Sequence, residues 1–265
     1  MSKIKEELSN HFAKLRLLGE GATSSAFYGE RKKDGLPCVV KVFQRGLDEA
    51  AGEQPLARFE REVKALASLS HRAIVKIVEW GKTASFPYLV LEYKAASSLE
   101  EFLKKRAAPL PWPQTVKIMA TLAQALAHAH KNKIIHRDIK PANILLLKDG
   151  SPMLIDFGLV RSGFMQTYRT ATGVILGSPA YMAPELFGTE RADESTDLYS
   201  LAVVTYEMLT GEKAFRGTLS DIIRQKMSKG LSLASTVELP PALAAIVNGL
   251  LRQRKDRLKV SAQEL

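Results

Sequence analysis

The sequence predicts an α+β fold in which a small antiparallel β-sheet with one helix precedes a larger, mainly helical part. Before residue 93, short apolar runs of strand length alternate with turn residues. After residue 93, apolar residues recur at helical spacing over longer stretches. The chain has 265 residues, of which 46% are hydrophobic and 25% charged. This length and composition allow a buried core without disulfides or a metal.

Short strands and one helix account for the first part. Asp34-Gly35 is typical of a hairpin turn. A helix is expected over 56–69, because Phe59, Val63 and Leu66 fall on one face. The strands are expected over 12–19, 26–31, 37–43, 74–80 and 88–93.

Helices account for most of the second part. Pro113 suits the first turn of one of them, in which Val116, Ala120, Ala123 and Ala127 fall on one stripe. Helices are expected over 98–105, 114–130, 193–210, 219–229 and 242–252, with short strands and loops over 136–185. Because ligand clefts favour the interfaces between compact parts, we expect the functional site between the two parts.

The composition excludes several classes of protein. The single cysteine, Cys38, rules out a disulfide framework within the chain and a cysteine-based zinc site, and we expect it to be a buried apolar residue. No stretch approaches 18 apolar residues, so no membrane-spanning segment is predicted, and the N-terminus lacks the apolar run of a secretory signal. The 38 Lys+Arg and 28 Asp+Glu give a net charge of +10. This charge suits an anionic partner but does not distinguish nucleic acid, an anionic membrane and nucleotides.

A glycine-rich turn, Gly19-Glu20-Gly21, joins the first two expected strands. Glycine lets a backbone approach phosphate groups closely and present its N–H groups to them. The third glycine of a G-x-G-x-x-G pattern is replaced by Ser24, and a strand follows, which disfavours a Rossmann dinucleotide site. No Gly-Lys-Ser/Thr follows either, so the turn is not a P-loop.

Lys41 lies within an apolar run that predicts a strand. A lysine in such a run must find an anion or reach water. Glu62, on the helix that follows, is the candidate partner, and an exposed lysine on an edge strand is the alternative.

The most specific pattern is the run from His136 to Asn143, His-Arg-Asp-Ile-Lys-Pro-Ala-Asn, followed by Asp156-Phe157-Gly158 and by Ala183-Pro184-Glu185. With the glycine-rich turn, Lys41 and Glu62 before them, these motifs follow one order over nearly the whole chain. In this order the chain resembles the protein kinases, and among them the bacterial, eukaryotic-like (Hanks-type) Ser/Thr kinases.

The resemblance implies a two-lobed protein-kinase fold over residues 1–265. It implies a small lobe over about 12–91, a hinge over 92–96 and a large lobe over 97–265, whose last helix is cut short. It also implies a buried Asp197 in the central helix of the large lobe and a pairing of Glu185 with Arg257.

The resemblance further implies transfer of the γ-phosphate of ATP to Ser/Thr hydroxyls, with Mg²⁺ as the metal ion and Mn²⁺ as a possible substitute. Lys41, held by Glu62, would bind the α- and β-phosphates. Asp138 would accept the proton of the substrate hydroxyl, and Lys140 would offset the charge of the γ-phosphate.

Metal and nucleotide contacts follow from the same resemblance. Asn143 and Asp156 would hold the metal ion. Backbone groups of Glu92 and Lys94 would face adenine, with Leu91 at the back of the pocket. The residues expected to contact the nucleotide are Gly19, Glu20, Gly21, Ala26, Val39, Lys41, Leu91, Glu92, Lys94, Asn143, Leu145 and Asp156. Ala26 and Val39 exchange the family's usual Val and Ala; because the total volume is kept, ATP is still expected to fit.

Regulation is expected in the segment between Asp156 and Glu185. Thr170 and Thr172 resemble the paired threonines that bacterial members autophosphorylate, and Arg137 would pair with the added phosphate. The alternative is that these threonines are ordinary polar residues of a loop.

The expected partners are proteins with Ser/Thr acceptors and a second copy of the chain for trans-autophosphorylation, with no nucleic acid and no membrane segment within the chain. The expected location is the cytoplasm, with the chain either free or the cytosolic domain of a longer, membrane-anchored protein. Other functions stay open: a pseudokinase scaffold or nucleotide-binding regulatory module, a nucleic-acid-binding protein suggested by the charge alone, and a kinase of small molecules.

Overall fold

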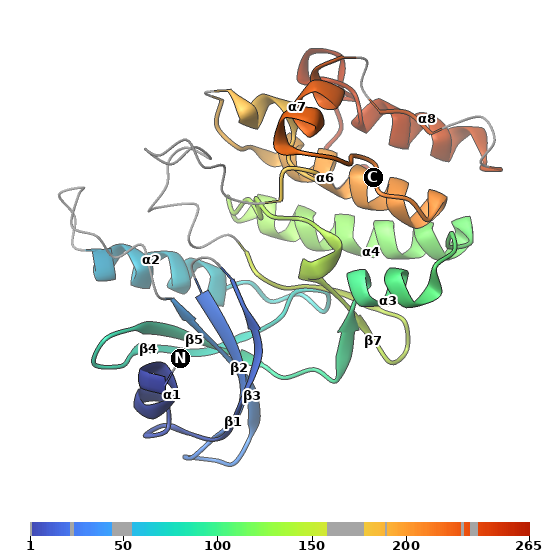
Figure 1. Ribbon diagram of the computed structural model, residues 1–265. Coiled ribbons are helices and arrows are strands. Elements are labelled where there is room, and N and C mark those ends of the chain that lie inside the picture. The colour runs from blue at the N-terminus through green and yellow to red at the C-terminus, as the bar shows by residue number, and fades with distance from the viewer. Residues whose placement is uncertain are drawn as a thin grey trace. The chain divides into compact units, whose positions relative to one another are not determined.

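The computed structural model describes residues 2–21, 24–43, 55–157, 178–188, 190–228, 231–233 and 238–265 (Figure 1). The chain divides into two compact units. The first, which we call the sheet unit, contains Met1–Ser70 and Val75–Ala95. The second, the helical unit, contains His71–Ile74 and most of the chain from Ala96 onwards.

The sheet unit is built on one antiparallel sheet in which the strand order is β1-β2-β3-β5-β4. Its strands are β1 (Phe12–Glu20), β2 (Ser24–Arg31), β3 (Pro37–Phe43), β4 (Ile77–Lys82) and β5 (Pro87–Glu92). The predicted strands are confirmed, except that β4 begins three residues later than the expected start at Ile74. Ile74 instead forms an isolated bridge with Leu154 in the helical unit, so its apolar character reflects a different contact.

One face of this sheet carries the core of the unit. Successive side chains of a strand point to opposite faces, and Cys38, Val40 and Val42 are the buried residues of β3 on this face. Helix α1 (Ser2–Leu8) covers this face with Ile4 and Leu8. The sequence prediction missed α1, because a helix of two turns places too few apolar residues in the pattern to show a period. Cys38 is buried as predicted, and burial raises the pKa of its thiol to about 11.

The opposite face of the sheet carries Lys41, and we call it the Lys41 face. Helix α2 (Pro55–Ala67) packs at the end of β3, where the rings of Phe43 and Phe59 lie 5.4 Å apart, edge to face. Figure 1 shows α1 and α2 on different sides of the sheet. The predicted helical face of α2 is confirmed at Phe59 and Val63, which are buried.

The helical unit is centred on α6 (Glu194–Thr210), which packs against α4 and α8. All residues from Thr196 to Thr205 are buried, so α6 is enclosed on every side over this length. Asp193 caps its N-terminus, and Gly211 ends it with φ 71°, a left-handed conformation that favours glycine. The other helices are α3 (Leu99–Arg106), α4 (Trp112–Lys131), α7 (Leu219–Ser228) and α8 (Pro241–Leu250).

Short elements complete the helical unit. Strands β6 (Ala96–Ser98), β7 (Ile144–Leu147) and β8 (Pro152–Leu154) form a second antiparallel sheet. Single 3₁₀ turns lie at η1 (Pro141–Asn143), η2 (Pro184–Phe187) and η3 (Arg254–Asp256). The predicted α+β class, an antiparallel sheet with a helix followed by a mainly helical part, is confirmed. Of the helices that the structure describes, none has the length and apolar composition needed to cross a membrane.

The stripe of α4 that carries Val116, Ala120, Ala123 and Ala127 is only partly its buried face. Of the four residues Ala123 is buried, whereas Val116, Ala120 and Ala127 are partly exposed. The larger side chains decide which face turns inward, because burying them removes more apolar area from water. The buried residues of α4 are Thr115, Ile118, Met119, Leu122, Ala123, Ala125, Leu126, Ala129 and His130.

We predict that α1 contributes to the stability of the sheet unit. Leu8 is fully buried, so Leu8→Ala should lower the free energy of unfolding by about 2–5 kcal/mol through lost burial and the cavity left behind. Leu36→Ala is the matched control, because Leu36 is 54% exposed. Urea unfolding followed by Trp80 fluorescence, in a Trp112→Phe background, reports on the sheet unit. Equal urea midpoints for the two variants would contradict the prediction.

Candidate active site

The segment that follows α4 is anchored by one buried carboxylate, that of Asp197 on α6. Asp197 is 1% exposed and accepts the backbone N–H of His136 at 2.8 Å and of Arg137 at 2.9 Å. The Nε2 of His130, on the last turn of α4, donates to it at 2.9 Å. A buried carboxylate with this many donors is satisfied, and it fixes the backbone that leads into Asp138.

The anchored backbone is in an unusual conformation at Arg137. Its φ of 66° lies in the left-handed region, which costs a residue with a side chain roughly 1–2 kcal/mol. The hydrogen bond from its N–H to Asp197 offsets this cost. Such backbone strain is concentrated at functional sites, and it here directly precedes Asp138.

The Asp138 carboxylate is held by two side chains from its own segment. Its Oδ2 lies 3.0 Å from Nζ of Lys140 and accepts the Nδ2 of Asn143 at 3.0 Å. Nδ2 of Asn143 also donates to the Asp138 carbonyl at 2.8 Å. Because both contacts of the Asn143 amide use its nitrogen, its oxygen is the atom that can serve as a ligand. Lys140 also donates to the hydroxyl of Ser178 at 3.1 Å.

Asp156 is brought to this segment through its neighbours. The Ile155 N–H donates to the Asn143 carbonyl at 3.0 Å, and the Ile155 carbonyl accepts Nε2 of His136 at 3.0 Å. The rings of His136 and Phe157 lie 4.4 Å apart. Asp156 itself has φ 64°, a second left-handed residue at the site. The contacts on both sides of Asp156 therefore fix it relative to Asn143.

His136 connects these two segments as a neutral ring. Burial lowers the pKa of His136, which favours the uncharged form near neutral pH. Nε2 carries the proton that is donated to Ile155, and Nδ1 accepts the N–H of Asp138 at 3.3 Å. A neutral imidazole can donate at one nitrogen and accept at the other, as this arrangement requires.

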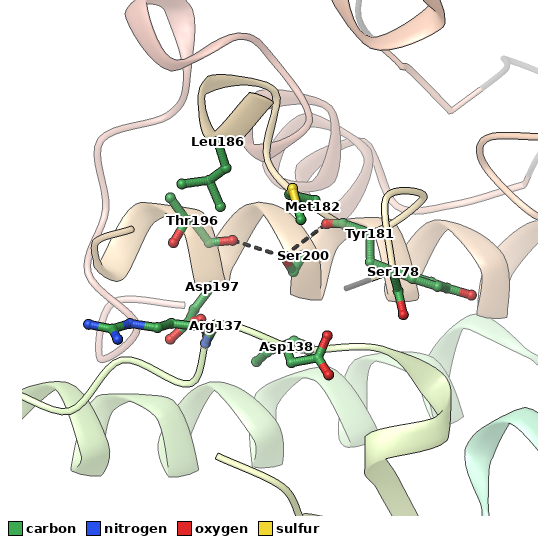
Figure 2. A pocket seen from close by; sticks show the side chains of 10 residues that line it. Arg137, Asp138, Ser178, Tyr181, Met182, Leu186, Thr196, Asp197 and Ser200 are labelled. Carbon is green, nitrogen blue, oxygen red and sulfur yellow. Dashed lines mark hydrogen bonds between the residues drawn. The ribbon is translucent and has the colours of Figure 1, made fainter. Parts of the chain in front are cut away.

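A pocket opens beside Asp138. Figure 2 shows Arg137 and Asp138 on one side of it and Ser178, Tyr181 and Met182 on the other. Its lining residues are Arg137, Asp138, Ile139, Ser178, Tyr181, Met182, Leu186, Thr196, Asp197 and Ser200. Polar side chains such as Ser178 and apolar side chains such as Met182 thus lie together next to the Asp138 carboxylate.

The wall of this pocket is tied to α6 and to the end of the chain. Ser200 donates to the Tyr181 carbonyl at 2.9 Å, and the Tyr181 hydroxyl donates to Glu207 at 3.0 Å. Burial beside Glu207 raises the pKa of Tyr181, so this hydroxyl stays protonated and remains a donor. Glu185 and Arg257 form a buried, two-pronged ion pair with N···O distances of 2.6 and 2.9 Å.

The Lys41 face of the sheet unit brings the expected nucleotide residues into two rows. In antiparallel strands, residues opposite each other share a face. One row joins Ala26 of β2 to Lys41 of β3. The next row joins Tyr28, Val39 and Leu91. Ala26, Val39, Lys41 and Leu91 therefore share this face.

The glycine-rich turn lies at the end of the Lys41 face. Gly19 is opposite Ala26, and a Cβ placed on Gly19 would meet no atom within 4 Å. The Gly21 N–H donates to the Ser24 carbonyl at 2.8 Å, which closes the hairpin. The backbone at Gly19 is thus open to close approach by a ligand.

The other expected nucleotide residues take different positions. The Glu92 N–H donates to the Lys76 carbonyl at 3.0 Å, so a ligand at Glu92 would have to use its carbonyl. Lys94 forms an ion pair of 2.9 Å with the Glu92 carboxylate.

Glu62 lies one helical turn after Phe59 on α2, and Lys41 lies two residues before Phe43 on β3. The Phe43–Phe59 contact thus brings the elements that carry Lys41 and Glu62 together. Leu145 is a half-buried residue of β7 in the helical unit.

The regulatory candidates Thr170 and Thr172 lie outside the described residues, as does Gly158. Among the residues that the structure describes, no three or more His, Cys, Asp or Glu side chains gather as a metal-binding group. A cation at Asn143 and Asp156 would therefore take its remaining ligands from water or from a substrate.

Comparison with known proteins assigns nearly the whole chain to one family. The family model described as "Protein kinase domain" matches residues 12–264. The chain belongs to the protein kinase domain family.

Three relatives of this kinase domain come from bacteria. It is 37% identical over 233 residues to the "Serine/threonine-protein kinase PknL" of Mycobacterium tuberculosis, covering 87% of this chain and 57% of PknL. It is 33% identical over 214 residues to PrkC of Bacillus subtilis, covering 81% of this chain and 32% of PrkC. It is 34% identical to PknB of Mycobacterium leprae over 79% of this chain and 34% of PknB. The kinase domain thus spans about half or less of these relatives' length.

The sequence did not predict a role for two residues of the kinase domain, Tyr28 and His130. Tyr28 lies on the Lys41 face, and its ring meets that of Tyr93 edge to face at 5.0 Å, with Arg16 5.8 Å from its centre. The alternation of β2 contained this signal, because Tyr28 is two residues after Ala26. His130 gave no such signal, because its partner Asp197 is distant in sequence.

We predict that Asp197→Asn destabilises the helical unit of the kinase domain. An asparagine amide directs its NH₂ at one of the N–H groups that the carboxylate accepts, so at least one hydrogen bond to a charged group is lost. The expected loss is at least about 1.5–3 kcal/mol in the free energy of unfolding, measured by urea titration. Glu212→Gln, on an exposed side chain, is the control and should be near neutral. An Asp197→Asn protein as stable as this control would contradict the assigned anchor.

Proposed function

We propose that this chain is the catalytic domain of a protein Ser/Thr kinase, which transfers the γ-phosphate of ATP to Ser/Thr hydroxyls of proteins. The observation that carries the proposal is the Asp138 carboxylate, bound by Lys140 and Asn143 at the edge of the pocket. Membership of the protein kinase domain family and relatives that are named Ser/Thr protein kinases support it.

In the proposed reaction, Asp138 orients the acceptor hydroxyl and takes its proton as the new O–P bond forms. The bond between the γ-phosphorus and the bridging oxygen breaks, and ADP leaves. Lys140, 3.0 Å from Asp138, places an ammonium group where it can offset charge on the transferred phosphoryl group. A kinase site needs this kind of positioning and charge stabilisation more than a nucleophile of its own.

Asn143 and Asp156 fit a divalent cation by the chemistry of their donors. An amide oxygen and a carboxylate are hard oxygen ligands, which Mg²⁺ and Mn²⁺ accept. When bound, the ion would neutralise charge on the phosphates of ATP. Asn143 has the further role of holding Asp138, so the acceptor side and the phosphate side of the site share one residue.

The Lys41 face is the proposed nucleotide site. Lys41 would bind phosphate oxygens, with Glu62 as its partner, and the open backbone at Gly19 would lie close to them. Val39, Ala26 and Leu91 would contact adenine through their apolar side chains, and the Glu92 carbonyl and the Lys94 N–H would give it backbone partners. Leu145, on β7 of the helical unit, is a further residue that the family resemblance assigns to the nucleotide.

Asp138→Asn should lower phosphoryl transfer by about 10²–10⁴-fold, because the proton acceptor is lost while the side chain keeps its shape. Mass spectrometry of phosphosites after incubation with Mg·ATP measures this. Asp149→Asn, in an exposed turn where the carboxylate bonds to Ser151, should leave transfer unchanged. Nucleotide binding should survive in both variants. Wild-type protein without phosphosites, or an Asp138→Asn protein as active as wild type, would contradict the proposal and favour a pseudokinase.

We further propose that a copy of the chain phosphorylates Thr170 or Thr172 of another copy. The added phosphate would pair with Arg137, whose backbone is fixed by Asp197. The double variant Thr170→Ala/Thr172→Ala should lose activity by about tenfold or more. Its activity is measured beside wild-type protein that has been dephosphorylated and then incubated with Mg·ATP. Full activity of the double variant and of unphosphorylated wild type would contradict this regulation.

A further inference from the structure

Helix α7 contains a buried lysine that the proposed reaction does not use. Lys226 is 1% exposed and is the one buried residue of α7, all of which the structure describes. Its neighbours on both sides, Gln225 and Met227, are exposed. A fully buried position of a helix ordinarily carries an apolar side chain, because burying an amine removes it from water.

The Lys226 amine is enclosed by a carbonyl, a hydroxyl and two rings, and its burial lowers the pKa of this amine well below its usual value. Nζ donates to the Met182 carbonyl at 2.8 Å and lies 3.4 Å from the Tyr199 hydroxyl. It lies 3.9 Å from the ring centre of Phe215 and 4.9 Å from that of Tyr199. Within the described part of the chain, no carboxylate forms an ion pair with it. Its one short polar contact is therefore the bond to the Met182 backbone.

That contact fixes the wall of the pocket beside Asp138. Met182 and Tyr181 both line the pocket, and the carbonyl of each is held by a side chain from a different helix. Ser200 of α6 holds the Tyr181 carbonyl, as Figure 2 shows, and Lys226 of α7 holds that of Met182. Without Lys226, the second of these two adjacent carbonyls would lose its donor.

Packing alone does not account for a lysine at this place. An apolar side chain of similar length would fill the space between the rings of Phe215 and Tyr199 without the desolvation of an amine, but it would leave the Met182 carbonyl without its donor. We infer that Lys226 is a positioning residue, which holds the Met182 backbone so that the pocket has the shape required by the acceptor protein. The inference rests on the proposed kinase function.

The test compares variants that differ in the donor. Lys226→Met removes the side-chain donor, Lys226→Gln places a donor on a shorter side chain, and Lys226→Arg keeps a donor on a long side chain. Arg224→Met is the control on the same helix, where a cation with a side chain 77% exposed is lost. The acceptor is the Asp138→Asn chain, whose phosphorylation by the active protein is followed with labelled ATP. ATP hydrolysis in the absence of acceptor gives KM for ATP.

Lys226→Met should raise KM for the acceptor by about tenfold, with kcat and KM for ATP within about twofold of wild type. KM for the acceptor should be intermediate between the Lys226→Met and wild-type values in Lys226→Gln. It should be close to the wild-type value in Lys226→Arg and in Arg224→Met. A merely structural role would change kcat and both KM values together, or only the melting temperature, and this would overturn the inference. An unchanged acceptor KM in a folded Lys226→Met protein would overturn it too.

If Lys226→Met does not fold, as judged by circular dichroism, the Gln and Arg variants decide. The inference is supported if KM for the acceptor is raised at least about threefold in Lys226→Gln but not in Lys226→Arg. Equal acceptor KM values in the two variants contradict it. Failure of the proposed kinase function itself is a separate result, because wild-type protein would then transfer no label.

Discussion

The Asp197 carboxylate is the constraint on which the candidate site depends. It lies within the enclosed part of α6 and accepts N–H groups from His136, Arg137 and the side chain of His130. A buried carboxylate is stable only when it is fully bound, so the segment before Asp138 cannot move away from α6 without exposing an unsatisfied charge. The same bonds offset the strain at Arg137, whose left-handed backbone leads into Asp138. The position of Asp138 thus follows from the packing of α6.

Other parts of the site are held in the same way, by buried polar side chains that bind backbone groups. His136 holds the Ile155 carbonyl beside Asp156, Ser200 holds Tyr181 and Lys226 holds Met182. Each bond is strong because little water competes for it, and each would be costly to leave incomplete. Loops that carry reactive groups can be irregular under these conditions, since Asp197 and Ser200 of α6 and Lys226 of α7 bind their backbone groups.

The sequence predicted the strands and most helices, because these features are local. Alternation identified β1 to β3, and the fixed spacing from His136 to Asn143 predicted the residues of the candidate site. Helix α1 was missed because two turns give no clear period. The stripe of small apolar residues on α4 does not by itself give the buried face of the helix, because the larger side chains decide which face turns inward. Lys226 was missed because its partners are distant in the sequence, and a lysine on a helix is usually exposed.

The most direct test of this account is amide hydrogen exchange at His136 and Arg137 in the wild-type protein. If Asp197 anchors the segment, these two amides exchange only when the helical unit opens. They should therefore be as protected as the amides of α6 from Leu201 to Thr205. Exchange at the rate of exposed turn amides, such as that of Ser151, would show that the bonds to Asp197 do not hold the segment, and would contradict the account.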